Sequence, residues 1–220
     1  SFWAFRFTGL NPENGGPQFD LTGIDLDAAA SDATLYMDYA GKMDPDFTSG
    51  MSFTLRYKTL SLTSGLYFSF GNKAFMAPMS SNYESIPGEE YNMSTEWLKR
   101  WRKPGDEKTT TVPSLPNIST SAQPINVPVS VGTRLKPYEL YAKSDVRVVD
   151  AWFIRCNSIQ LAYPLPPAKL PHFLQNLSVS FSMTNPFQIR SKDFLGRDPE
   201  VALGNQPMSH DYSLGISLSF

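Results

Sequence analysis

The sequence contains a single cysteine and only two histidines among its 220 residues. Cys156 alone cannot form an internal disulfide or a cysteine-based zinc site, and His172 and His210 lie outside any ligand-spaced cluster. No apolar run approaches the roughly 18 residues of a membrane-spanning helix. The formal net charge of −2 gives no indication of a nucleic-acid surface. We therefore expect no cofactor, no metal site and no nucleic-acid partner.

Sequence signatures of catalysis are also missing. The chain has no glycine-rich phosphate loop, no G-x-S-x-G elbow and no H-E-x-x-H motif. Asp198 and Glu200 lie two residues apart, but no candidate partner for proton transfer is near them in the sequence. We expect these two carboxylates to lie in a solvated turn, and we expect no enzymatic activity.

The last nine residues alternate strictly between apolar and small polar side chains. In a β-strand, successive side chains point to opposite faces, so Tyr212–Phe220 would have one wholly apolar face and one face of serine and glycine. This pattern is typical of a membrane barrel strand, with hydrocarbon outside and a wet lumen inside. The residues predicted to face lipid here and in the strand before it are Leu177, Val179, Phe181, Met183, Leu214, Ile216, Leu218 and Phe220.

Five further segments repeat this alternation. They are Trp3–Thr8, Met51–Tyr57, Leu60–Phe70, Ile159–Tyr163 and Leu177–Thr184. A soluble β-sandwich could also alternate, but the recurrence of serine on the polar face and of aromatics at strand ends favours a membrane barrel. The sequence therefore predicts an all-β fold made of about six antiparallel transmembrane strands.

The connections between these segments are alternately short and long. Lys58 and Thr59 lie in a tight hairpin, whereas residues 11–50, 72–147 and 186–209 form long connections. This asymmetry is typical of outer-membrane barrels, whose long loops are extracellular. Six strands cannot close, because the smallest membrane barrels have about eight. We therefore expect residues 1–220 to be the C-terminal part of a larger barrel, without its plug and N-terminal strands.

One strand changes the parity of its apolar residues. Ile154 and Cys156 have one parity, and Ile159 and Leu161 have the other. Both pairs can face the same side only if an extra residue intervenes, so the pattern predicts a β-bulge near Asn157-Ser158. The bulge also lets Arg155 face inward.

The longest connection contains one predicted short helix. Thr95 would cap it, Pro104-Gly105 would end it, and Trp97 and Trp101 would lie on one face. These tryptophans, together with Tyr83 and Tyr91, are candidates for substrate or partner contact. The alternative is that the aromatics pack the loop onto its neighbours.

The same loop carries a short basic cluster. It consists of Lys99, Arg100, Arg102 and Lys103. We expect a solvated helix face, and contact with lipopolysaccharide or a partner is the alternative.

Seven motifs occur along the chain in a fixed order: Gly9–Gly15, Tyr57–Leu62, Glu96–Trp101, Asp150–Pro166, Asn185–Phe187, Gly196–Glu200 and Tyr212–Gly215. In this order and spacing they resemble motifs of SusC/RagA-type TonB-linked outer-membrane proteins, in which Glu96–Trp101 fits the long-loop helix and Asp150–Pro166 a late barrel strand. The resemblance covers essentially the whole chain.

The resemblance implies a bacterial outer-membrane location and a multi-pass barrel of about 22 strands with a plug. Proteins of this family import oligosaccharides or peptides, take energy from TonB through an N-terminal region, and work with a SusD-like surface lipoprotein. The expected partners are therefore the rest of the barrel and its plug, the SusD-like lipoprotein, TonB and outer-membrane lipid. The alternative from a different class is a soluble all-β carbohydrate-binding module.

Overall fold

The computed structural model describes residues 1–20, 37–79, 93–117, 120, 125–126, 134–201 and 205–220. The chain divides into two compact units. The first unit comprises Ser1–Met43 and Lys73–Val149, and the second unit comprises Asp44–Asn72 and Asp150–Phe220. Each unit is described by itself.

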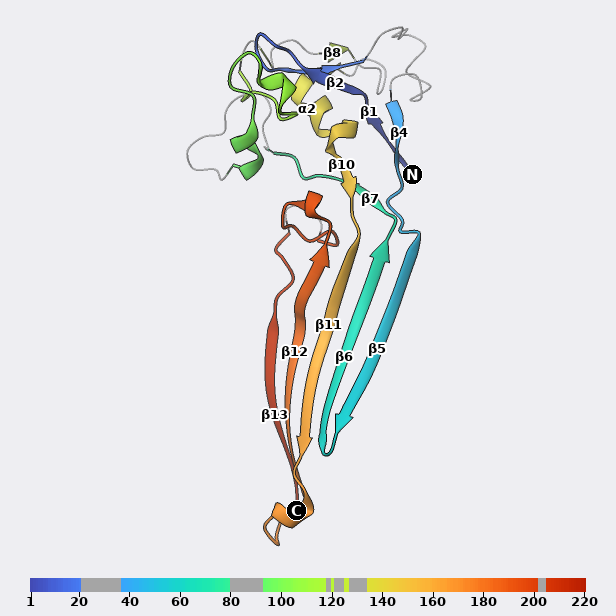
Figure 1. Ribbon diagram of the computed structural model, residues 1–220, viewed down its shortest axis with the longest axis vertical. Helices are drawn as coiled ribbons and strands as arrows, with labels where there is room; N and C mark the ends of the chain where they lie inside the picture. The colour runs from blue at the N-terminus through green and yellow to red at the C-terminus, as the bar shows by residue number, and fades with distance from the viewer. Residues whose placement is uncertain (21–36, 80–92, 118–119, 121–124, 127–133, 202–204) are drawn as a thin grey trace. The chain divides into compact units, whose positions relative to one another are not determined.

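The second unit is built on one antiparallel sheet of five strands. Their order across the sheet is β13-β12-β11-β6-β5, as Figure 1 shows. The strands are β5 (Phe47–Tyr57), β6 (Leu60–Phe70), β11 (Phe153–Pro164), β12 (Asn176–Arg190) and β13 (Asp211–Ser219). These are five of the six predicted segments, and the tight turn at Lys58 is present with φ 55°. The predicted all-β class is confirmed.

The register gathers the apolar residues on one face, which we call the apolar face. Phe181 of β12 lies opposite Leu214 on one side and Leu161 on the other. Leu62 of β6 continues the row between Leu161 and Leu55. On the opposite, polar face, the matching row is Ser213, Ser182, Gln160, Thr63 and Thr54. The alternation read from single strands therefore extends across the whole sheet.

The sheet is a single layer. All strands described in the second unit belong to it, and large side chains on its apolar face are exposed. Leu214, Ile216 and Leu55 are 73%, 66% and 60% exposed. A sandwich would bury such a face against a second sheet. The exposed apolar face therefore disfavours the soluble β-sandwich.

The predicted bulge in β11 is confirmed. Cys156 pairs with Leu66 and Phe187, whereas Ser158 pairs with Gly65 and Thr184, so Asn157 has no partner of its own in the ladder. Because of this extra residue, both apolar segments of β11 lie on the apolar face. Arg155 consequently lies on the polar face.

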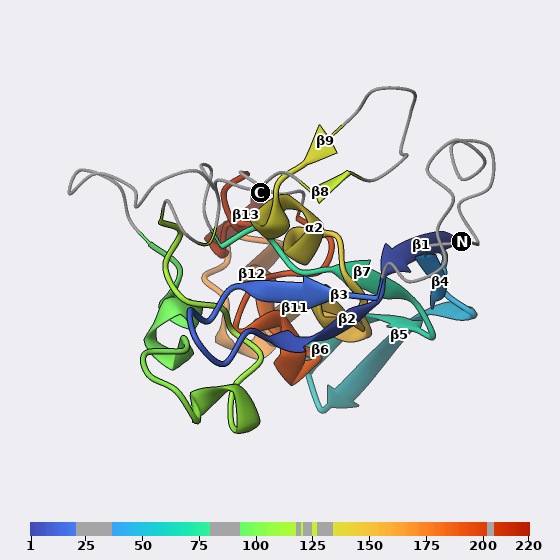
Figure 2. The same cartoon turned by 90° about the horizontal axis from the view of Figure 1, so that it is seen from above.

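The prediction that Trp3–Thr8 forms one barrel strand is wrong. The segment breaks at Arg6 into β1 (Phe2–Phe5) and β2 (Phe7–Leu10), which pair with β4 (Met37–Gly41) and β3 (Pro17–Phe19) in the first unit. Ala4 and Phe5 are both fully buried, so both faces of β1 are covered at these two residues. A strand between lipid and lumen would not have this pattern. Figure 2 shows β2 and β3 side by side.

The first unit packs around aromatic side chains. Its core contains Met79, Trp97, Tyr138 and Tyr141, with Phe7 and Phe19 packed against it. The remaining elements are β7 (Lys73–Phe75), η2 (Thr95–Lys99), η3 (Asp106–Lys108), β8 (Ile125–Asn126), β9 (Arg134–Leu135), α2 (Pro137–Ala142), η4 (Asp145–Arg147) and β10 (Val148–Asp150). β7 pairs with β10, and β8 pairs with β9. The second unit adds η5 (Pro167–Lys169) and η6 (Lys192–Phe194).

The predicted loop helix is present in a shorter and tighter form. It is a 3₁₀ helix that ends at Lys99, and Ser94 rather than Thr95 caps it, since the Ser94 side chain accepts a hydrogen bond from the Glu96 amide. Trp101 therefore lies beyond the helix and does not share a helical face with Trp97. The sequence prediction missed α2, which starts at Pro137 and carries the two buried tyrosines of the core. Among the described residues, no helix has the length and hydrophobicity to cross a membrane.

Candidate functional site

A polar cluster of the second unit lies on the polar face, where β11 begins and β12 ends. The bulge at Asn157 turns Arg155 to this face, and the register puts it opposite Gln188. Phe153, two residues earlier, lies opposite Arg190. The guanidinium of Arg155 is 5.5 Å from the centroid of the Phe153 ring, and the Arg155 side chain is only 6% exposed. An arginine buried this deeply requires a counter-charge.

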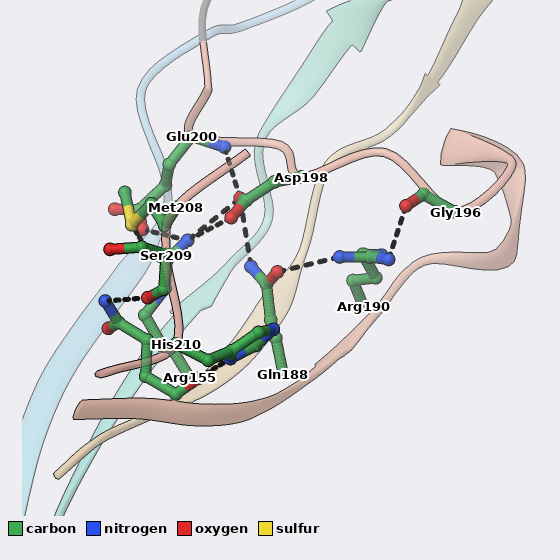
Figure 3. Close-up of polar contacts among 10 residues, drawn as sticks. Arg155, Gln188, Arg190, Gly196, Asp198, Glu200, Met208, Ser209 and His210 are labelled. Atoms are coloured by element: carbon green, nitrogen blue, oxygen red, sulfur yellow. Dashed lines mark hydrogen bonds and ion pairs between the residues drawn. The ribbon is translucent and has the colours of Figure 1, made fainter. Parts of the chain in front are cut away.

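The loop between β12 and β13 supplies that counter-charge. Nη2 of Arg155 lies 2.8 and 2.7 Å from the two carboxylate oxygens of Asp198 and 2.7 Å from Oε2 of Glu200. Nε2 of Gln188 donates to Oδ1 of Asp198 at 3.1 Å. Figure 3 shows these side chains converging from β11, β12 and the loop. The cluster therefore fixes the loop to the sheet.

Further contacts hold both arms of this loop. Arg190 donates to Oε1 of Gln188 at 3.0 Å and also to the carbonyl oxygen of Gly196. On the second arm, Met208 contacts Arg155 through its sulfur, and His210 contacts the Asn185 carbonyl through Nδ1 (Figure 3). The loop is thus attached to the sheet at several points on each arm.

At the centre of the cluster, the two negative charges of Asp198 and Glu200 face the single positive charge of Arg155. Two carboxylates share one nitrogen of Arg155, while Nε of the same residue is buried and has no hydrogen-bond partner in the described part of the chain. Burial raises the pKa of the Glu200 carboxyl above 4.5, with Arg155 opposing this shift and the charge of Asp198 adding to it. Glu200 is therefore the weaker of the two anionic contacts.

The expectation that Asp198 and Glu200 lie in a solvated turn holds for Glu200, whose side chain is 36% exposed, but is wrong for Asp198. The side chain of Asp198 is 11% exposed and is bound by both Arg155 and Gln188. The parity of β11 predicted an inward arginine but not its partner, because a loop has no side-chain period.

We expect Glu200→Gln to hold the β12–β13 loop more tightly at neutral pH. The raised pKa means that ionised Glu200 costs stability in the folded loop, and this cost disappears as the pH falls through the folded-state pKa toward 4.5. Glutamine removes the charge and can still accept a hydrogen bond from Arg155. Hydrogen–deuterium exchange of residues 205–210, measured from neutral to acid pH, should show protection that rises on acidification in the parent protein and stays level in the variant.

The matched comparison for this experiment is Asp198→Asn. It removes the carboxylate that receives two contacts from Arg155, so it should loosen the same loop at every pH tested. Equal loosening by Glu200→Gln would contradict the unequal roles of the two residues.

A second buried ion pair lies in the first unit. Arg147 and Glu96 are in direct contact, with side chains 3% and 7% exposed. Arg147 also donates to the carbonyl oxygen of Ala77 at 2.6 Å and lies 5.7 Å from the centroid of the Tyr141 ring. Burial raises the pKa of Tyr141 to about 12, although the charge of Arg147 opposes the shift. This pair ties η2 to η4.

The candidate contact residues Trp97 and Trp101 are buried in the first unit, at 3% and 8% exposure. Nε1 of Trp97 donates to the Met79 carbonyl oxygen at 3.1 Å, and Nε1 of Trp101 donates to Glu107 at 3.3 Å. The Trp101 ring lies so close to Gly15 that a Cβ there would come within 2.4 Å of it. This arrangement favours the packing alternative. Tyr83 and Tyr91 lie outside the described residues.

The described residues include no group of three His, Cys, Asp or Glu side chains that could hold a metal ion. His172 lies exposed in the turn after η5. Cys156 is buried beside Ser64, with 3.5 Å between Sγ and Oγ.

Comparison with known proteins finds likeness in three-dimensional structure alone. No protein-family model matches the sequence, and neither does any curated protein. Among the matching solved structures are three of the RagAB peptide importer. They are the RagAB transporter (TM-score 0.67) and the importer in its "closed-closed" (0.65) and "open-open" (0.64) states.

Each match is 21% identical in sequence and covers 100% of this chain. The chain spans only 22–23% of the length of the matched chains. At this identity the likeness shows the fold, which is that of a segment of the RagAB importer. The predicted resemblance to a SusC/RagA-type protein is confirmed at that level.

Proposed function

We propose that residues 1–220 are the C-terminal part of a TonB-dependent outer-membrane importer. The observation that carries this proposal is the single-layer sheet, with its continuous apolar face exposed and serine and threonine on its polar face. An antiparallel sheet in water buries one face against a core, whereas a membrane barrel has lipid against its apolar face and water in its lumen. The likeness to RagAB supports a transporter rather than an enzyme.

The proposed assembly extends beyond this chain. The edge strands β5 and β13 leave backbone groups that only further strands can satisfy within a membrane, so the rest of the barrel and its plug are the first partners. The RagAB complex supports a SusD-like surface lipoprotein as a further partner, and energy would come from TonB through an N-terminal region. The cargo is a peptide or an oligosaccharide, with peptides first because RagAB is a peptide importer.

Within this barrel, the polar face of the sheet lines the lumen. The β12–β13 loop would then project into the lumen near its extracellular mouth, held by Arg155 and its carboxylate partners. We propose that the loop narrows the entrance without contributing catalysis. Trp97 and Trp101 serve to pack the first unit, while contact with cargo or partner through Tyr83 and Tyr91 stays a prediction.

Gene deletion and complementation test the proposal. The full-length protein should appear in the outer-membrane fraction and require detergent for extraction, whereas a soluble carbohydrate-binding module would be extracted without it. Deleting the gene should abolish growth on a defined peptide mixture as sole nitrogen source, or on an oligosaccharide mixture as sole carbon source. Loss of TonB should have the same effect. Normal growth of the deletion strain on both mixtures, or extraction in plain buffer, would overturn the proposal.

A further inference from the structure

A compact basic pocket lies in the first unit, between η2 and the residues that follow η3. It is open to solvent, and its polar lining consists of Lys99, Arg100, Arg102, Asp106, Thr109 and Thr110. Three cations on one concave surface form a suitable lining for an anion, whereas the hydroxyls of Thr109 and Thr110 already donate to the backbone carbonyls of Asp106 and Lys99. The expected solvation of the basic cluster is observed, since Lys99, Arg102 and Lys103 are exposed, but only Lys99 lies in a helix because η2 ends there.

The two carboxylates of η3, Asp106 in the pocket lining and Glu107 next to it, accept hydrogen bonds from backbone amides. Oδ2 of Asp106 accepts hydrogen bonds from the backbone amides of Arg102 and Lys103, at 3.0 and 3.1 Å. Glu107 accepts from the Gly105 amide at 2.7 Å, and hydrogen bonds from the backbone lower the pKa of its carboxyl. No ion pair between residues in the described ranges involves Lys99, Arg100 or Arg102. The cationic side chains therefore keep their charge available.

The pocket is also built to hold its shape. Arg100 donates through Nη1 to the Trp97 carbonyl at 3.0 Å, and Arg102 donates through Nη2 to the Leu98 carbonyl at 3.2 Å. Each guanidinium is thereby held by one nitrogen and retains further N–H donors. The Thr110 hydroxyl donates to the Lys99 carbonyl at 2.6 Å and joins the two sides of the pocket. For the two arginines, little side-chain order would have to be gained on binding.

We propose that this pocket binds a phosphate group. A phosphate monoester carries close to two negative charges at neutral pH and three acceptor oxygens, which match two guanidinium groups and one ammonium. The phosphate could belong to a glycolipid of the outer leaflet or to free phosphate in solution. The proposal rests on the pocket itself and does not depend on transport.

The test uses the full-length protein in detergent at low ionic strength. Two probes separate the two sources: inorganic phosphate followed by calorimetry, and vesicles with or without lipid A followed by co-sedimentation. Arg100→Gln with Arg102→Gln removes two pocket cations and should weaken binding of the effective probe about tenfold or more. Lys99→Gln should also weaken binding of the probe. The Lys99 side chain donates no hydrogen bond to the described residues, so this substitution should leave the fold intact.

The matched control is Lys103→Gln with Lys108→Gln. It makes the same change in charge on the same segment but outside the pocket lining, and binding should change less than twofold. The probe that binds, inorganic phosphate or lipid A vesicles, identifies the source of the phosphate group. The proposal is supported if the pocket variants lose this binding and the control variant keeps it. Absence of binding to both probes overturns the proposal, as does equal weakening by the control variant.

Discussion

Replacing Ile216 or Phe181 with arginine is expected to reduce insertion of the full-length protein into the outer membrane. Both side chains lie on the apolar face, where Ile216 pairs with Val179 and Phe181 pairs with Leu214. A charge on the lipid face of a barrel costs roughly 2–4 kcal/mol near the bilayer midplane. The measurements are the amount of protein in the outer-membrane fraction and the urea midpoint of protein refolded into vesicles.

The matched controls are Ser217→Arg and Ser180→Arg. These serines adjoin the test positions along β13 and β12 but lie on the polar face, opposite Ser178 and Gly215. Gly215 has no side chain, so an arginine at position 180 can extend along the polar face into water. We expect the serine variants to insert at close to parent levels. Similar losses in both pairs would contradict a wet lumen and favour a face buried in protein.

The five strands of the sheet could be predicted because each has a different environment on its two faces. Leu60–Phe70 was predicted with its observed bounds, and the change of parity between Cys156 and Ile159 was enough to locate the bulge. Trp3–Thr8 has the same alternation, yet Ala4 and Phe5 are both buried, because the first unit covers both faces of β1. Alternation shows that a segment is extended and not what covers it.

The candidate site was less predictable than the sheet. Arg155 could be assigned to the polar face by parity, but its partner Asp198 is 43 residues away in an irregular loop. The same limit applies to Glu96 and Arg147, which are 51 residues apart and join two short 3₁₀ helices. Pairs of this kind are set by the tertiary packing of loops. Short-range patterns contain no signal for them.

The Glu96–Arg147 pair is where we expect the largest loss of stability in the first unit. Arg147→Met leaves the Glu96 carboxylate buried without its counter-charge and removes the hydrogen bond to Ala77. Breaking a buried ion pair from one side costs about 3–5 kcal/mol. Hydrogen exchange and limited proteolysis of residues 93–117 in the full-length protein would measure local opening, which should increase strongly.

Two further variants test whether the loss of stability in Arg147→Met comes from the unpaired charge of Glu96. Replacing both partners, Glu96→Leu with Arg147→Met, should recover much of the loss, because a buried ion pair exchanged for apolar side chains is often close to neutral. Arg6→Met breaks the exposed pair with Asp38, whose side chains are 31% and 59% exposed, and should cost less than about 1 kcal/mol. If the double variant opened as readily as Arg147→Met alone, the loss would come from packing against Tyr141 rather than from the stranded charge of Glu96.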